Sequence, residues 1–155
     1  MSIGNQILSN QILMSAVASW FIAQFIKMLL ELLTTGTIRV ERLYGNGGMP
    51  SSHSATVCGL ASSAAYCYGI GSFEFAISFI FAMVVMTDAM GVRRETGKQS
   101  RLLNMMMQED FWNFDDPDKL QMRLKELIGH TPMQVCCGAV LGILIAAAIQ
   151  LIFYH

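Results

Sequence analysis

Four long apolar segments alternate with polar ones along the chain, at about 12–33, 54–70, 73–90 and 133–154. Each is close to the ~17–25 residues that cross a bilayer as a helix. Lipid offers no partner for a bare peptide group, so each segment is predicted to be helical. The pattern therefore predicts an all-α fold, a polytopic membrane helical bundle with about four transmembrane helices. We expect a single integral membrane domain over residues 1–155.

Two polar segments, 34–52 and 91–131, separate the apolar ones. We expect the second to contain short helices, with an amphipathic one over Lys119–Leu127. Four spans would place both segments on one side of the membrane and the two termini on the other. Nine of the 10 basic residues lie in these segments: Arg39, Arg42, Arg93, Arg94, Lys98, Arg101, Lys119, Arg123 and Lys125. The positive-inside rule then predicts that both polar loops are cytoplasmic.

The composition supports a membrane protein and excludes other classes. The chain is 54% hydrophobic and 14% charged, whereas soluble domains carry roughly 25% charged residues. The net charge is −1 and no run is strongly basic, so we expect no nucleic-acid partner. The four cysteines lie in apolar segments without zinc-ligand spacing to a histidine, and we expect no metal and no cofactor. The small residues of the second and third spans suit close helix packing and permit a homodimer.

A glycine-rich segment, Gly47–His53, leads directly into the second apolar helix. Serine is a preferred N-cap, and glycine lets the backbone approach a ligand closely. A helix N-terminus presents N–H groups and a partial positive charge, which suits phosphate. Ser51, Ser52 and His53 are therefore candidate phosphate-site residues; the alternative is an ordinary capped helix start.

His130 precedes the last span in the same way. Thr131 is a natural N-cap and Pro132 a natural first helical residue. The predicted topology places His130 on the same membrane face as His53. Two of the 3 histidines thus lie next to helix N-termini on one membrane face. This common placement favours a shared site.

Charged residues near the spans provide candidate partners for an anion. Arg93, Arg94 and Lys98 follow the third span, and arginine binds phosphate through a planar fork. Asp88 ends that span, where an ionisable group indicates function. Lys27 shares a face of the first helix with Gln24 and Glu31. It could pair with Glu31 and snorkel outward, which we favour, or point into the bundle towards the same site.

Three short motifs together resemble a known family. Met-Pro-Ser-Ser-His-Ser at 49–54, Asp-Ala-Met-Gly-Val-Arg-Arg at 88–94 and Gly-His-Thr-Pro at 129–132 are similar to the divergent branch of the type 2 phosphatidic acid phosphatase family. This branch is also described as acid phosphatase/vanadium-dependent haloperoxidase related. The resemblance implies phosphate binding by Ser51 and Ser52, proton donation by His53, and a nucleophilic His130 that forms a phosphohistidine.

The chain departs from the parent family at several positions. Gln134 stands where the parent family has an aspartate, and a glutamine can hold an imidazole but cannot stabilise an imidazolium by charge. Arg123 and Leu124 stand in place of a Ser-Arg pair. The parent's first motif, Lys, six residues, Arg-Pro, has no match anywhere in the chain; Arg93, Arg94 and Lys98 are candidates to replace its cations.

These observations predict a metal-independent phosphatase acting on a membrane lipid phosphate or diphosphate at the cytoplasmic face. The alternative is a non-catalytic membrane protein that binds anionic lipid head groups or a protein partner. A vanadate-dependent haloperoxidase is a third and weaker hypothesis. A shared phosphoryl centre requires that His53 and His130 converge, since reacting groups must approach to ~3–3.5 Å.

Overall fold

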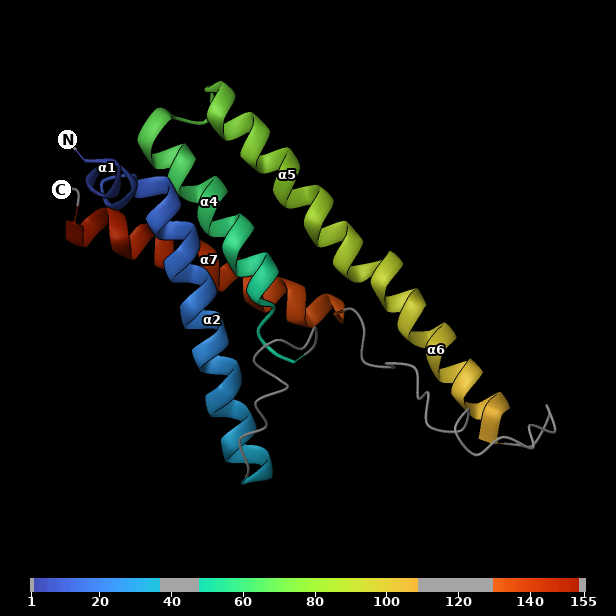
Figure 1. Cartoon of the computed structure of the whole chain (residues 1–155). Helices are drawn as coiled ribbons and strands as arrows, with labels where there is room; N and C mark the ends of the chain where they lie inside the picture. Colours follow the sequence, from blue (N-terminus) through green and yellow to red (C-terminus); the bar gives the residue numbers. More distant parts are fainter. Residues whose placement is uncertain (1, 37–47, 109–129, 154–155) are drawn as a thin grey trace.

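The computed structural model describes residues 2–36, 48–108 and 130–153 (Figure 1). The described chain is helical and contains no strand, which confirms the predicted all-α membrane bundle. The helices are α1 (Ile3–Leu8), α2 (Gln11–Thr35), α4 (Ser52–Tyr68), α5 (Phe73–Met90), α6 (Val92–Gln108) and α7 (Pro132–Phe153).

Three stretches of the described chain are long and apolar enough to cross a membrane: Gln11–Thr35, Phe73–Met106 and Pro132–Ile152. The helix α4 occupies the second predicted span but has only 17 residues. The four-span topology therefore stays a prediction.

The helices begin where short polar side chains can cap them. Asn10 accepts a hydrogen bond from the Leu13 amide at the start of α2, at 3.1 Å. Ser51 caps α4, and Ser72 caps α5 by accepting from the Phe75 amide at 3.1 Å. The helix α2 ends at Gly36, whose φ of 67° is the left-handed conformation that glycine adopts at least cost.

The helix α4 lies at the centre and packs against α2, α5 and α7. Its buried positions are almost all small: Ser52, Ser54, Ala55, Val57, Cys58, Gly59, Ala61, Ser63 and Ala64. Small side chains let helix backbones approach each other closely, which is how membrane helices gain packing contacts. Most of the exposed large apolar side chains, such as Phe21, Phe79 and Leu144, lie on the other helices.

Glycines make the closest approach, between α4 and α7. A Cβ atom on Gly138 would lie 2.3 Å from the carbonyl oxygen of Ser51. One on Gly142 would lie 2.2 Å from the carbonyl oxygen of Ala55. Both distances are shorter than any real contact, so these two positions require glycine for the helices to meet. Through Gly138, this packing sets where α4 begins relative to α7.

A polar contact joins three helices at the opposite end of the bundle. The Gln11 side chain of α2 donates to the Gln150 side chain of α7. The Cys67 thiol of α4 donates to the Gln11 side-chain oxygen at 3.1 Å. The start of α2, the end of α4 and the end of α7 therefore lie at one level, next to the short connection into α5.

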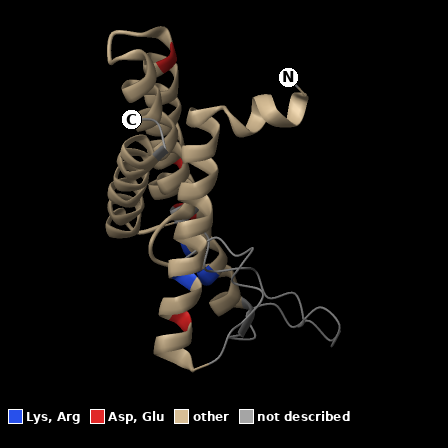
Figure 2. Ribbon diagram, turned by 90° about the vertical axis from the view of Figure 1, so that its left-hand side faces the viewer, with Lys and Arg blue, Asp and Glu red and all other residues tan. Residues whose placement is uncertain are grey.

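Among the described helices, sequence periodicity did not single out α1 and α6. The helix α1 has six residues, too few for a recognisable period. The helix α6 continues almost directly from α5 and accounts for part of the expected helical content of 91–131. The amphipathic helix predicted over Lys119–Leu127 lies outside the described residues. In the described part of the chain, Lys and Arg gather in the half of the bundle away from the α4–α5 turn (Figure 2).

We expect Gly142→Ala to destabilise the bundle, because its methyl group would collide with the Ala55 carbonyl and with the Gly59 amide nitrogen, 2.8 Å away. Overpacking of this kind costs about 1–3 kcal/mol. Thermal unfolding of the detergent-solubilised protein measures the change. Gly71→Ala is the matched control, since a Cβ there meets nothing within 4 Å. Equal melting temperatures for the two variants would show that the α4–α7 contact is not as close as described.

Candidate functional site

Two histidines from distant parts of the chain come together at the ends of two helices. His53 lies in the first turn of α4 and is half-buried. His130 lies just before Thr131, the residue that caps α7, and is 3% exposed. Their ring centroids are 6.2 Å apart, with the ring planes inclined at 55°. This separation lets both rings contact one small group between them. The two candidate histidines, which are far apart in the sequence, are therefore neighbours in space.

Backbone hydrogen bonds hold the two histidines in place. The Ser51 amide, at the start of α4, donates to the Gln134 carbonyl in the first turn of α7 at 3.1 Å. The His130 amide donates to the Ala89 carbonyl, near the end of α5, at 3.0 Å. Main-chain hydrogen bonds thus join the ends of three helices. Asp88, which is half-buried, precedes Ala89 in the chain and so lies next to one of these hydrogen bonds.

The start of α7 is a reciprocal capping box. The Thr131 hydroxyl accepts from the Gln134 amide at 3.3 Å, and the Gln134 side-chain oxygen accepts from the Thr131 amide at 3.0 Å. This is the Ser/Thr-x-x-Glu/Gln arrangement that satisfies two backbone donors at a helix N-terminus. The predicted N-cap, Thr131, and the predicted first helical residue, Pro132, are both confirmed.

Gln134 also determines the orientation of the His130 ring. Its Oε1 atom lies 3.3 Å from Nδ1 of His130. That atom must be an oxygen, because it also accepts from the Thr131 amide, which can only donate. We therefore assign the proton of a neutral His130 ring to Nδ1, which leaves the lone pair on Nε2. A histidine in this tautomer can act as a nucleophile through Nε2.

The N-terminus of α4 carries two buried serines. The Ser51 side chain is completely buried and accepts from the Ser54 amide at 3.3 Å and from the Ser54 hydroxyl at 3.0 Å. Ser52 is 3% exposed, and its carbonyl accepts from the Thr56 hydroxyl. The helix start also presents backbone N–H groups and a partial positive charge. Both features suit an anion.

Lys27 of α2 points into the bundle, not out to the membrane surface. It is 6% exposed, and its aliphatic stem packs on Gly48: a Cβ there would lie 3.3 Å from Cγ of Lys27. Gly48 also has a φ of 88°, so both its conformation and its neighbour call for glycine. Of the two alternatives for Lys27, the inward one describes the structure. This buried cation lies beside the segment that leads into Ser51.

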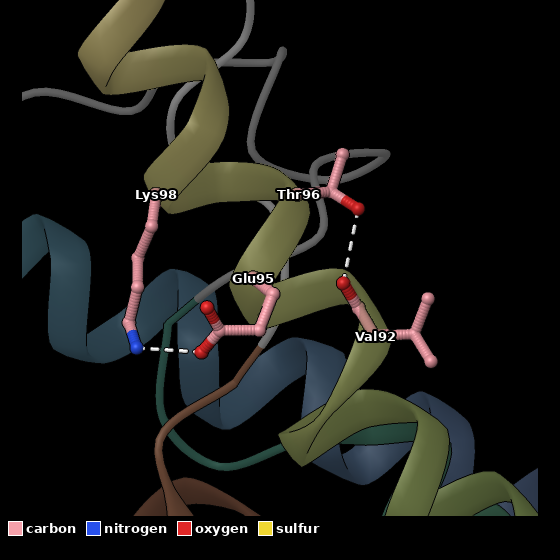
Figure 3. Close-up of polar contacts among 4 residues, drawn as sticks. All are labelled: Val92, Glu95, Thr96 and Lys98. Atoms are coloured by element: carbon pink, nitrogen blue, oxygen red, sulfur yellow. Dashed lines mark hydrogen bonds and ion pairs between the residues drawn. The ribbon is translucent and has the colours of Figure 1, made fainter.

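Unlike Lys27, the candidate cation Lys98 of α6 is exposed. Lys98 forms an ion pair with Glu95 at 2.5 Å, with both side chains about 60% exposed (Figure 3). Thr96, on the same helix, bonds to the carbonyl of Val92. An exposed pair of this kind contributes about 0–1 kcal/mol, so Glu95 holds Lys98 only weakly. Arg93 and Arg94 lie in the first turn of α6, and their side chains are outside the described residues.

The fold and the site define a helical membrane protein with a paired-histidine polar site among its helix ends. A family model described as the Divergent PAP2 family matches residues 8–145. The chain belongs to this family, as its motifs indicated. It is 36% identical over 157 residues to an uncharacterized membrane protein, YuiD, of Bacillus subtilis (strain 168), covering 96% of this chain and 99% of that protein. No solved structure matches the chain.

Proposed function

We propose that this protein is a metal-independent phosphatase that removes phosphate from a membrane lipid phosphate or diphosphate. The observation that carries the proposal is the 6.2 Å approach of His53 and His130 at two helix N-termini. Membership of the Divergent PAP2 family supports a phosphatase-related fold. The basic loops predict that the site faces the cytoplasm.

The reaction proceeds in two steps. Nε2 of a neutral His130 attacks phosphorus in line, an N–P bond forms, and the P–O bond to the lipid breaks. The departing oxygen takes a proton from the His53 imidazolium, so that the lipid leaves as an alcohol or as a monophosphate. Neutral His53 then accepts a proton from water, which attacks the phosphoimidazole and releases phosphate. His130 returns to its starting state, and His53 is again protonated.

The negative charge of the transferring group needs fixed positive partners. In this proposal the N-termini of α4 and α7 and the buried Lys27 supply them. Ser51 donates through its hydroxyl and Ser52 through its backbone. In this proposal Arg93, Arg94 and Lys98 add charge from the start of α6, where Lys98 would exchange its exposed contact with Glu95. Pre-oriented groups of this kind stabilise the transition state because they need no reorganisation during the reaction.

Gln134 limits how well the phosphorylated His130 is stabilised. It orients the His130 ring as an aspartate would, but it carries no charge to stabilise the positive imidazole of the intermediate. This observation also favours the second candidate function, a protein that binds anionic lipid head groups without turnover. In that case the same residues would bind a lipid phosphate at equilibrium and release no phosphate.

Phosphate release from phosphatidic acid and from a prenyl diphosphate, with the protein in vesicles, tests the phosphatase directly. We expect activity that His130→Ala abolishes, because the nucleophile is lost, and that His53→Ala lowers by about 10²–10⁴-fold, the contribution of a general acid. His155→Ala, at the third histidine, is the matched control and should retain full activity. Full activity in His130→Ala would exclude the assigned nucleophile, and saturable lipid binding without release would favour the second candidate.

Gln134→Glu should change the pH dependence while keeping the capping box, because glutamate serves equally well at this helix position. A carboxylate beside His130 would favour the charged imidazole and so raise the pKa of His130. The nucleophile must be neutral, so the acidic limb of the pH–rate profile should move to higher pH. The rate above that limb should increase. An unchanged profile would show that Gln134 does not contact the reacting histidine.

A further inference from the structure

The helix α2 continues well past the level of the site. Lys27 marks that level, since it packs on Gly48 beside the start of α4. The helix goes on to Thr35, eight residues or about 12 Å further at 1.5 Å per residue. Figure 1 shows the C-terminal part of α2 projecting beyond the start of α4.

This projecting part of α2 has two chemically different sides. Leu29, Leu30, Leu32 and Leu33, which we call the leucine face, are exposed by 44%, 39%, 40% and 73%. Glu31 and Thr34 are four and seven residues after Lys27, so they share its side of the helix. The polar side therefore continues the direction of Lys27, and the leucine face points away from it.

Helix length indicates where the membrane boundary lies. Gln11 contacts Cys67 and Gln150 at the far end of the bundle. Lys27 lies sixteen positions after Gln11, about 24 Å along the helix, whereas the hydrocarbon core is about 30 Å thick. With Gln11 at one boundary, the site falls about 6 Å short of the other. The projecting turns of α2 cover the remaining thickness.

We propose that the leucine face lies in the hydrocarbon and contacts lipid chains, so that the His53–His130 site is recessed below the membrane surface. Lys27, Glu31 and Thr34 then line the inner side of α2 between the site and the water. The consequence for substrates rests on the proposed function: the phosphate must descend below the level of the head groups. A terminal phosphate or diphosphate on a lipid chain fits this position, and a phosphodiester with a large head group does not.

Nitroxide spin labels at positions 29 and 33 measure the depth directly. The labels are attached to Leu29→Cys and Leu33→Cys, in a chain whose four cysteines are replaced by alanine, reconstituted in phosphatidylcholine–phosphatidylglycerol vesicles. We expect both labels to collide more with oxygen, which partitions into lipid, than with a water-soluble nickel chelate. A label at Ile143, exposed midway along α7, is the lipid reference, and one at Gln99, exposed on α6, is the comparison outside the leucine face.

Preferential collision with the nickel chelate at positions 29 and 33 would overturn the proposal, because the leucine face would then lie in water. If the cysteine-free chain fails to fold, Leu29→Trp and Leu33→Trp give the same measurement in a Trp20→Phe, Trp112→Phe chain. Lipids brominated along their chains should then quench the new tryptophan more strongly than an aqueous quencher does. Neither measurement needs turnover, so an inactive protein with lipid-exposed labels would contradict the phosphatase and leave the recessed site standing.

Discussion

The site depends on the close approach of α4 to α7. The Ser51 amide reaches the Gln134 carbonyl only because Gly138 has no side chain where the Ser51 carbonyl passes. This contact places the first turn of α4, with His53, against the residues that precede α7, with His130. Moving α4 outward by the width of a methyl group would break the backbone tie and separate the two rings. The small residues along α4 are therefore as necessary to the proposed chemistry as the histidines themselves.

Gln134 links the local structure of a helix end to the state of a reactive ring. Its backbone carbonyl holds α4, its side-chain oxygen caps α7, and the same oxygen faces Nδ1 of His130. A glutamine does all of this without bringing a negative charge into a site that, in the proposed function, binds an anion. The neutral residue thus favours phosphate binding and an uncharged nucleophile, while it offers less stabilisation to the phosphorylated imidazole.

Much of this arrangement could be predicted from the sequence, because it rests on local rules. The apolar segments predicted the long helices, and Ser51 and Thr131 predicted two helix starts by their capping chemistry. The inward direction of Lys27 could not be predicted, since its neighbours along α2 fit snorkelling equally well; only the packing on Gly48 decides it. Likewise, Lys98 pairs with Glu95, which would compete with a bound phosphate for the lysine ammonium. The sequence shows that Lys98 is near the third span but does not show this pairing.

A phosphorylated histidine is the most direct evidence for the proposed chemistry. A lipid diphosphate labelled in its terminal phosphate should transfer that phosphate to His53→Ala protein, because the departing monophosphate needs little help from a proton donor, whereas release of the bound phosphate loses its base. Mass spectrometry under alkaline conditions then locates the label. The account predicts a phosphoryl group on His130, absent from the His53→Ala, His130→Ala double variant. His53→Ala protein that still cleaves the lipid diphosphate and carries no label on His130 would contradict it.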